Sequence, residues 1–517
     1  MEDKALRGVR WTLLGFFSNR GLMLATTLLL ARLLVPSDFG LVAFATLAIT
    51  LLTHVTSLGI PQAMVVRHDL TERGLGTVLS MVLVLYGASA VILALGSPLV
   101  AELFGDSRVR GVLLALSVPV AFNGLSTFYW AVLQRELEFG RHFACQVAST
   151  ATYAGVAITL ALLDAGVWSI VAGQIASSVV YTAAVVLAAP WRVRPSFDRA
   201  QARQIWISGR GFLMQGGFSF VQQNTDYFIV GSALGSSALG FYSMAYKLSE
   251  LPNDALGEPV AEVTFPGFAR MHHRSQEIKE PFLRVLRLVA LVVCPLGVLL
   301  AAAADPFVHA VLGDKWLAMI GPLSVLGIWG AIRPVQATIA WMLNSTGHAG
   351  RIGSVYGVVL ILTIPLLVLA VNLGGLTAVS WVMVGDITIA LVAVTAITHR
   401  RTGIEVASVA RAVRPVAVAC PVAWAVAWGV SRALDPAPAI IALCASAAAG
   451  AIAYLTVVTW SDPGVIRMAR TEIGRALRRR PDGSSYAPDA DRQLEDQAIE
   501  AGAVTGGSAR YGRESHL

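Results

Sequence analysis

Apolar segments of about 20 residues recur along the chain, and most basic residues lie in every second connection between them. Each segment has the length that a helix needs to cross a bilayer, and the 517 residues contain roughly fourteen of them. Connections 192–203, 270–287 and 467–480 are rich in Lys and Arg, whereas 36–39 and 235–238 contain none. Because cytoplasmic loops retain positive charge, this pattern predicts an all-α polytopic membrane protein with both termini in the cytoplasm.

The composition excludes an ordinary soluble domain. Apolar residues make up 56% of the chain and charged residues 14%, against about 25% charged in a typical soluble protein. The net charge of +7 follows the topology rather than one surface patch, so no nucleic-acid partner is expected. The basic segment 461–480 suits anionic lipid headgroups, and residues 481–517 have the composition of a disordered tail.

The sequence repeats itself at an offset of about 200 residues. Residues 31–45 align without gaps with residues 231–245, and Gly40 and Gly240 are among the identities. Parallel repeats of this kind build transporters whose sites lie between the two halves. We predict two six-helix lobes, two extra helices and a tail. The predicted domains are 1–200, 201–400, 401–460, 461–480 and 481–517.

Basic residues also occur inside the apolar segments, where a lone charge near mid-bilayer costs roughly 2.5–3.5 kcal/mol. They are Arg20, Arg32, Arg210, Lys247 and Arg333. Arg32 and Arg210 lie near segment ends, from which a long side chain reaches the interface. Arg20, Lys247 and Arg333 lie deeper and are expected to face a water-filled cavity.

Acidic residues are concentrated in the eighth segment. Glu250, Asp254, Glu258 and Glu262 recur every four residues, a spacing that keeps them within one sector of a helix. The alternative is that the stretch 249–262, which contains two prolines, is a solvated loop or a helix end. The repeat favours a membrane helix, because the corresponding part of the first half is apolar.

Further polar side chains interrupt three other segments. Asn224 follows Gln223 in the seventh segment, and Asp226 is placed there to pair with Lys247 on the next helix or to take up a proton. Asp386 and His54 are further proton-relay candidates, although a hydrogen-bonded structural role suits a lone histidine equally well.

Motifs of several enzyme classes are missing from the sequence. No P-loop, H-E-x-x-H or G-x-S-x-G motif occurs, and the connections on the basic-poor side are too short for a catalytic domain. An enzyme is therefore the least favoured class. A non-transporting scaffold of a glycan-assembly complex stays open, and the test is whether neutralising every embedded charge leaves function intact.

Two stretches resemble a known family. The opening LRGVRWTLLGFFSNRGLMLATTLLLARLLVPSDFGLVAFA and the stretch Phe212–Pro252 resemble bacterial polysaccharide exporters related to the colanic-acid exporter. The resemblance covers about residues 5–460. It implies a V-shaped, MATE-like pair of lobes around a central cavity, in the bacterial inner membrane.

The resemblance also implies a substrate and an energy source. The substrate would be an oligosaccharide repeat unit on undecaprenyl pyrophosphate, flipped to the periplasmic leaflet by alternating access. No cofactor is expected beyond a proton or sodium gradient. Candidate protein partners are a polysaccharide polymerase and a chain-length regulator. The alternative within the superfamily is a cation or multidrug antiporter that uses the acidic residues.

On this basis we assign hypothetical roles to the embedded polar residues. Arg20 and Arg333 would bind the pyrophosphate, while Lys247 and Asp226 would form a gating pair. Ion coupling would fall to Glu250 and Asp254. The remaining predicted site residues are Asn19, Gln223 and Asn224 in the cavity wall, and Asp386 for ion coupling or gating.

Overall fold

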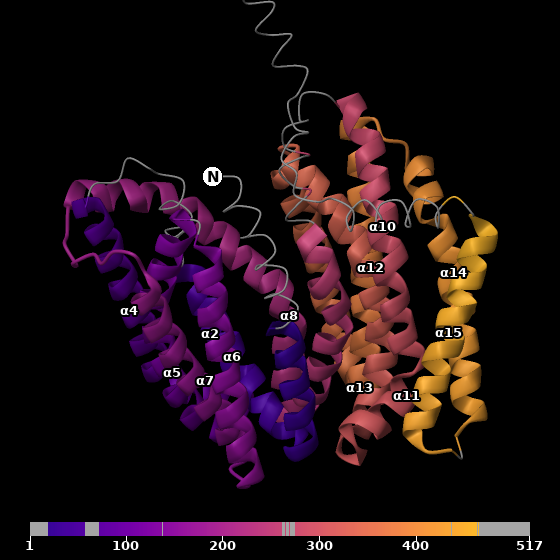
Figure 1. Ribbon diagram of the computed structural model, residues 1–517, viewed down its shortest axis with the longest axis horizontal. Helices are drawn as coiled ribbons and strands as arrows, with labels where there is room; N and C mark the ends of the chain where they lie inside the picture. Colours follow the sequence, from indigo (N-terminus) through magenta and orange to yellow (C-terminus); the bar gives the residue numbers. More distant parts are fainter. Residues whose placement is uncertain are drawn as a thin grey trace, which may run out of the picture.

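The computed structural model describes residues 19–56, 72–136, 138–260, 264, 268, 275–435, 437–462 and 464. These residues form helices and short connections, and no strand occurs among them. Figure 1 shows two groups of helices side by side, with α14 (Val406–Ala433) and α15 (Ala439–Ser461) at the outer edge of the second group. The predicted all-α class is confirmed.

The first group, here called the N-lobe, covers residues 19–188. It contains a helix over residues 19–33, α2 (Pro36–Thr56), α4 (Glu72–Phe104), α5 (Arg108–Arg135), α6 (Phe139–Leu162) and α7 (Val167–Ala188). Tyr86, Phe128 and Val185 belong to an apolar cluster that joins α4, α5 and α7. Burial of this cluster holds the N-lobe together.

The second group, here called the C-lobe, covers residues 220–402. Its elements are α8 (Arg199–Pro252), η1 (Asn253–Gly257), α10 (Ser275–Ala302), α11 (Ala304–Phe307), η2 (Val308–Leu312), η3 (Asp314–Met319), α12 (Ile320–Ser345) and α13 (Ala349–Thr402). The start of α8 lies on the N-lobe, because the Asp198 amide donates to Thr77 Oγ1 of α4 at 3.0 Å. The Asp198 carboxylate caps this start by accepting the amides of Ala200 and Gln201.

Helices α8 and α13 each double back on themselves. In one straight helix, Tyr242 would lie roughly 24 Å from Asp226 at 1.5 Å per residue, yet its hydroxyl donates to the Asp226 carboxylate at 2.7 Å. The chain reverses at Gly235, whose φ of 82° suits glycine. Gly375 plays the same part in α13, with a φ of 58°. Each of these helices therefore supplies two antiparallel segments.

Eleven helices are long and apolar enough to cross a membrane within the described part of the chain. The chain is therefore a multi-pass membrane protein. The predicted total of about fourteen spans stays a prediction, since the first helix is described only from residue 19. The predicted domain boundaries also stay predictions, and most of the 461–480 segment and all of the 481–517 tail lie outside the described residues.

The two lobes meet where α2 packs against α8, on both sides of its reversal at Gly235. A buried cluster at this seam includes Leu41 and Phe44 of α2, Tyr242 of α8 and Trp316 of η3, all fully buried. Outside the seam, α14 packs against α10, and α15 packs against α14. The two extra helices therefore lie away from the interface between the lobes.

Candidate functional site

The seam between the lobes is closed at one end by a contact that only glycine permits. A Cβ on Gly40 would lie 1.7 Å from the Ser236 carbonyl oxygen, and a Cβ on Gly240 would lie 1.9 Å from the Pro36 carbonyl oxygen. The partners Pro36 and Ser236 are separated by the same offset of 200 positions as the two glycines. The sequence repeat is thus expressed as a pseudo-symmetric crossing of α2 and α8.

Aromatic and polar contacts extend this closed end, which we call the seal. Trp316 is fully buried, and its indole N–H donates to the Ala31 carbonyl oxygen at 2.7 Å. The Phe39 and Phe241 rings meet the Trp316 ring edge-to-face, at 5.4 and 5.9 Å between centroids. Ala31 and Phe39 come from the N-lobe and the other two residues from the C-lobe, so these contacts bind lobe to lobe.

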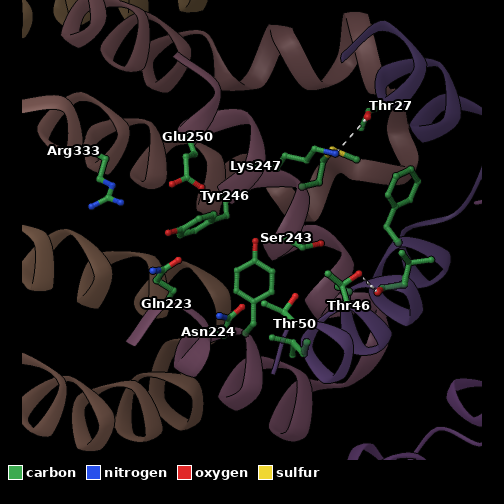
Figure 2. Close-up of a pocket in the computed structure, with 16 residues that line it drawn as sticks. Thr27, Thr46, Thr50, Gln223, Asn224, Ser243, Tyr246, Lys247, Glu250 and Arg333 are labelled. Carbon is green, nitrogen blue, oxygen red and sulfur yellow. Dashed lines mark hydrogen bonds between the residues drawn. The ribbon is translucent and has the colours of Figure 1, made fainter. Parts of the chain in front are cut away.

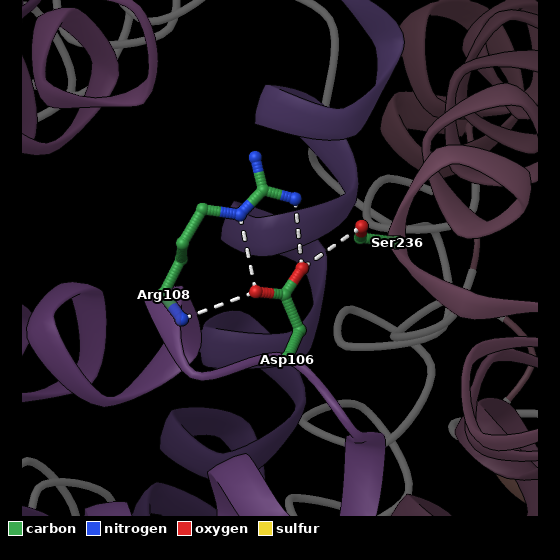
Figure 3. A network of polar contacts seen from close by, with 3 residues as sticks. All are labelled: Asp106, Arg108 and Ser236. Carbon is green, nitrogen blue, oxygen red and sulfur yellow. Dashed lines mark hydrogen bonds and ion pairs between the residues drawn. The ribbon is translucent and has the colours of Figure 1, made fainter.

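A further polar contact joins the lobes at the seal (Figure 3). The Ser236 hydroxyl donates to the Asp106 carboxylate at 3.1 Å. The Arg108 guanidinium donates to both oxygens of the same carboxylate, at 2.8 and 3.1 Å. These hydrogen bonds from Arg108 lower the pKa of Asp106 from its ordinary value. Asp106 is therefore an ionised acceptor that Arg108 holds in place for Ser236.

A chamber of about 410 Å³ lies between the lobes (Figure 2) and adjoins the seal, since Phe39 is among its lining residues. Its walls carry hydroxyl, amide and charged side chains from both lobes. The polar lining residues are Thr27, Thr46, Thr50, Gln223, Asn224, Tyr227, Ser243, Tyr246, Lys247, Glu250 and Arg333. Predicted site residues from two lobes therefore meet in one cavity.

Two cations face this chamber without a carboxylate in ion-pair contact. Within the described part of the chain, no carboxylate oxygen lies within 4.0 Å of the Lys247 ammonium or the Arg333 guanidinium. Lys247 Nζ has only a long contact of 3.5 Å to Thr27 Oγ1. Figure 2 shows Glu250 between the two cations. The chamber can therefore compensate an anion, as embedded cations require.

The Arg333 side chain is held from behind. Its Nη1 donates to Gln336 Oε1 at 3.2 Å, and Gln336 donates to the Tyr356 hydroxyl at 2.5 Å. The guanidinium also lies over the Trp329 ring, 5.9 Å from its centroid. Arg333 Nε is buried and has no hydrogen-bond partner. That donor is therefore unsatisfied in this state of the protein.

Arg20 lies at a different level from the predicted anion site. Its guanidinium lies 3.6 Å from Asp254 and 3.8 Å from Glu258, across the lobe interface. It is not among the described residues that line the chamber. We predicted that Arg20 would act with Arg333, and Asp254 with Glu250. The structure instead places Arg20 beside Asp254. Glu262 and the His54 and Arg210 side chains lie outside the described residues.

The predicted Lys247–Asp226 pair is not formed in this structure. Asp226 is buried in the C-lobe, where its carboxylate accepts the Tyr242 hydroxyl, while Lys247 points towards Thr27 of the N-lobe. Lys247 lies five residues beyond Tyr242, which turns it about 140° round the helix. The Asp226 side chain therefore faces the C-lobe, and the Lys247 side chain faces the N-lobe.

Asp226 and Asp386 share a small pocket inside the C-lobe. The pocket has a volume of about 20 Å³, room for about one water molecule. Asp386 accepts the Thr363 hydroxyl at 2.6 Å. Tyr356, which accepts from Gln336, also lines this pocket. One hydrogen-bonded chain therefore runs from Arg333 in the chamber to the pocket of the two carboxylates.

A second compartment of about 430 Å³ adjoins the chamber and shares Thr27, Thr46 and Lys247 with it. Its other polar residues lie on α6 and α7. They are Ser149, Thr150, Tyr153, Gln174 and Ser177, and sequence reasoning missed all of them. Their spacing places each set on one helix face, which is the signal that was available. The predicted site residue Asn19 accepts the Thr150 hydroxyl behind this wall.

A family model for polysaccharide biosynthesis proteins matches residues 29–321. The chain belongs to this family. The teichuronic acid biosynthesis protein TuaB of Bacillus subtilis is 26% identical over 74% of this chain and 80% of its own length. The succinoglycan biosynthesis transport protein ExoT of Rhizobium meliloti is 26% identical over 66% of this chain and 69% of its own length. The predicted exporter family is confirmed.

Solved structures share the fold. The lipid II flippase MurJ, in an inward closed conformation, superposes with a TM-score of 0.71 at 12% identity, covering 89% of this chain and all of that one. An inward-facing multidrug transporter of the MATE family gives a TM-score of 0.57 at 14% identity, covering 75% of this chain and 94% of that one. The predicted MATE-like architecture is confirmed.

Proposed function

We propose that this protein is a flippase for undecaprenyl-pyrophosphate-linked oligosaccharide repeat units in the bacterial inner membrane. The observation that carries the proposal is the chamber at the lobe interface with two cations, Lys247 and Arg333, that have no carboxylate within 4.0 Å. Membership of the polysaccharide biosynthesis family supports a glycan substrate. The fold shared with a lipid II flippase supports a lipid-linked one.

The chamber answers the main energetic problem of such a substrate. A pyrophosphate and a hydrophilic glycan cannot enter about 30 Å of hydrocarbon without partners. Lys247 and Arg333 compensate the two phosphates, and Gln223 and Asn224 supply amide groups at the same wall. The polyprenyl tail stays in the lipid through a lateral opening. The protein thereby replaces the water that the headgroup loses.

Alternating access follows from the placement of the seal. The seal lies on the basic-poor side, which topology assigns to the periplasm, with both termini in the cytoplasm. In this state the seam is closed towards the periplasm. Rocking of the lobes breaks the Gly40–Ser236 and Gly240–Pro36 contacts and exposes the chamber to the other side. Reclosing resets the cycle.

Ion coupling is assigned to the buried carboxylates. Asp226 and Asp386 share a pocket that accommodates a proton or one monovalent cation. The chain Arg333–Gln336–Tyr356 connects that pocket to the anion site. Glu250 opposes a bound pyrophosphate by Coulomb repulsion, so proton uptake at Glu250 favours anion binding. A proton or sodium gradient therefore drives the cycle without a further cofactor.

A cation antiporter fits the chamber less well. Asp254 and Glu258, which such an antiporter would use, lie within ion-pair distance of Arg20. Glu250 is the single carboxylate among the described residues of the chamber wall, which also holds two cations. The wall therefore favours an anion.

The downstream partners in this proposal are a polysaccharide polymerase and a chain-length regulator.

Reconstitution tests the proposal directly. The purified full chain is placed in vesicles that contain undecaprenyl pyrophosphate linked to glucose, galactose or N-acetylglucosamine, under an imposed H⁺ or Na⁺ gradient. Sugar that becomes accessible to an impermeant modifying enzyme reports flipping. Transfer faster than in protein-free vesicles is expected for at least one lipid. The antiporter would be favoured if all three lipids flipped no faster than in protein-free vesicles under both gradients, while the protein transported a lipophilic cation.

A further inference from the structure

The compartment against α6 and α7 differs chemically from the adjoining chamber. Hydroxyl, amide and phenol groups line it, and Lys247 at the shared boundary is its single charged residue among those described. Its volume of about 430 Å³ falls in the range of about 300–1,000 Å³ that small-molecule sites occupy. Met23, Phe39, Val42 and Ile170 complete the wall, and the polar groups among them need a polar occupant or water.

Several hydrogen-bonding groups of this compartment have spare capacity. Ser149 donates to the Ser177 carbonyl oxygen at 3.0 Å, which leaves the oxygen lone pairs of its hydroxyl free to accept. Within the described part of the chain, the Gln174 side-chain amide and the Tyr153 hydroxyl have no hydrogen-bond partner. The Gln174 carboxamide, which can donate and accept, and the Tyr153 phenol therefore line the cavity without a hydrogen-bond partner among the described residues.

The Tyr153 ring is held in position by the neighbouring helix. A Cβ on Gly173 of α7 would lie 3.1 Å from the ring and 2.9 Å from the Ala157 methyl group. Glycine at this position therefore lets the ring pack closely against α7. A fixed aromatic ring beside amide and hydroxyl groups offers an apolar face and polar edges together.

We propose that this compartment is the glycan subsite, which holds the sugars next to the pyrophosphate and discriminates among glycans. The inference rests on the proposed function. The first sugar of a lipid-linked saccharide is bonded directly to the pyrophosphate, so its site must adjoin the anion site, and Lys247 lies on the boundary of both cavities. The uncharged wall suits hydroxyl-rich groups, whereas the charged wall suits phosphates.

Binding measurements with and without sugar test the subsite. The purified full chain is titrated with bare undecaprenyl pyrophosphate and with the same lipid bearing glucose, galactose or N-acetylglucosamine. The wild-type chain is expected to bind at least one sugar-bearing lipid more tightly than the bare lipid. Gln174→Ala and Tyr153→Phe should each reduce that preference ~3- to 10-fold, the effect of one hydrogen bond, with the loss confined to the sugar-bearing lipids.

The control is Gln146→Ala, which removes the same side chain from an exposed position on α6 outside the compartment. It should leave the sugar preference intact. A preference that survives both subsite variants, or an equal loss for the bare lipid, overturns the subsite while the flippase proposal stands. A wild-type chain that binds the bare lipid but prefers no sugar does the same. Failure to bind any of the four lipids overturns both proposals.

Discussion

The same two helices, α2 and α8, behave differently at two levels of the seam. At the seal, Gly40 and Gly240 bring the backbones into direct contact, and each Cβ position is filled by a carbonyl group of the other lobe. One to two turns further along, Thr46 and Lys247 face a chamber of about 410 Å³. Close packing and a wet cavity therefore alternate along one pair of helices.

This contrast shows how rigid lobes can act as a switch. The seal has no slack at the glycine crossing, because the contacts there are between backbones, whereas the chamber walls consist of polar side chains. A packed interface tends to be either made or broken. The seal therefore sets which side is open, and the chamber sets what is carried. The Gly40, Arg333 and Ser236 substitutions each change one of these levels and leave the other intact.

The largest effect is expected from Gly40→Ala. The new methyl group would collide with the Ser236 carbonyl group, and backbone cannot yield as a side chain does. Overpacking costs about 1–3 kcal/mol, and the upper end corresponds to a ~100-fold loss of the closed state. The measurement is labelling of a Ser243→Cys reporter in the chamber by an impermeant thiol reagent from the basic-poor side, in a Cys444→Ser background. Labelling should accelerate sharply.

Gly87→Ala is the matched control for that experiment. Gly87 is also helical, in α4, but nothing lies within 4 Å of the position of its Cβ. It should label like the parent chain. If Gly40→Ala and Gly87→Ala label at the same rate, the seal is not the barrier between the chamber and the basic-poor side.

The next effect concerns the chamber. Arg333→Ala removes a guanidinium that has no carboxylate partner, and a charged hydrogen bond contributes about 1.5–3 kcal/mol. We expect a ~10- to 150-fold weaker affinity for undecaprenyl pyrophosphate, measured on the purified chain, and unchanged reporter labelling. Lys247→Ala should likewise weaken the affinity for undecaprenyl pyrophosphate and leave reporter labelling unchanged.

Arg432→Ala offers a matched control for the chamber variants. Arg432 lies over the Trp428 ring at 5.6 Å, as Arg333 lies over Trp329, but it is at the exposed end of α14. Its removal should leave binding unchanged. Equal affinities for the Arg333 and Arg432 variants would contradict an anion site in the chamber.

The seal and the chamber differ in how far the sequence could predict them. Basic-residue spacing predicted a multi-pass chain, and the gapless repeat predicted equivalent positions for Gly40 and Gly240, which meet at the seam. Embedded cations pointed to Lys247 and Arg333. The sequence carried no information on the relative height of the lobes, so it could not place Arg20 beside Asp254 and Glu258.

The hydroxyl groups of the second compartment illustrate a different limit. Ser and Thr in membrane helices commonly bond a carbonyl group of their own helix, as Thr152 does with Ala148. Thr150, two residues earlier, instead reaches Asn19 of another helix. Both patterns look alike in sequence, and the packing of α6 against the first helix decides between them. Cavity-lining hydroxyls therefore emerge only from tertiary structure.

The pocket that Asp226 and Asp386 share inside the C-lobe allows ion coupling to be tested separately from the seal and the chamber. Asp386→Asn keeps the size of the side chain and its bond to Thr363 while removing the charge from the shared pocket. We expect flipping in vesicles to lose its stimulation by the imposed H⁺ or Na⁺ gradient, with pyrophosphate-lipid affinity changed less than ~3-fold. Asp435→Asn, at an exposed turn, is the control. Full stimulation in the Asp386 variant would remove this pocket from the coupling route.

The smallest effect is expected from Ser236→Ala, which removes one side-chain contact of the seal and leaves the backbone contacts in place. A hydrogen bond of this kind contributes about 0.5–1.5 kcal/mol, so reporter labelling should rise only ~2- to 10-fold. Ser232→Ala on the same helix, whose hydroxyl bonds its own helix at Phe228, should have no effect.

The same contact also predicts the pH dependence of the seal. Because Arg108 lowers the pKa of Asp106, the ionised acceptor is present above the ordinary carboxyl range, and its contribution is lost only as pH falls through the lowered pKa. Thiol reactivity itself rises with pH, because the thiolate is the nucleophile. The labelling rate divided by that of the Asp106→Asn variant at the same pH should therefore be flat from about pH 5 to 8. A change in labelling within that range that disappears in Asp106→Asn would mean that Asp106 titrates there. The seal would then act as a pH-controlled gate, whereas a flat profile leaves gating to the glycine crossing and coupling to the C-lobe carboxylates.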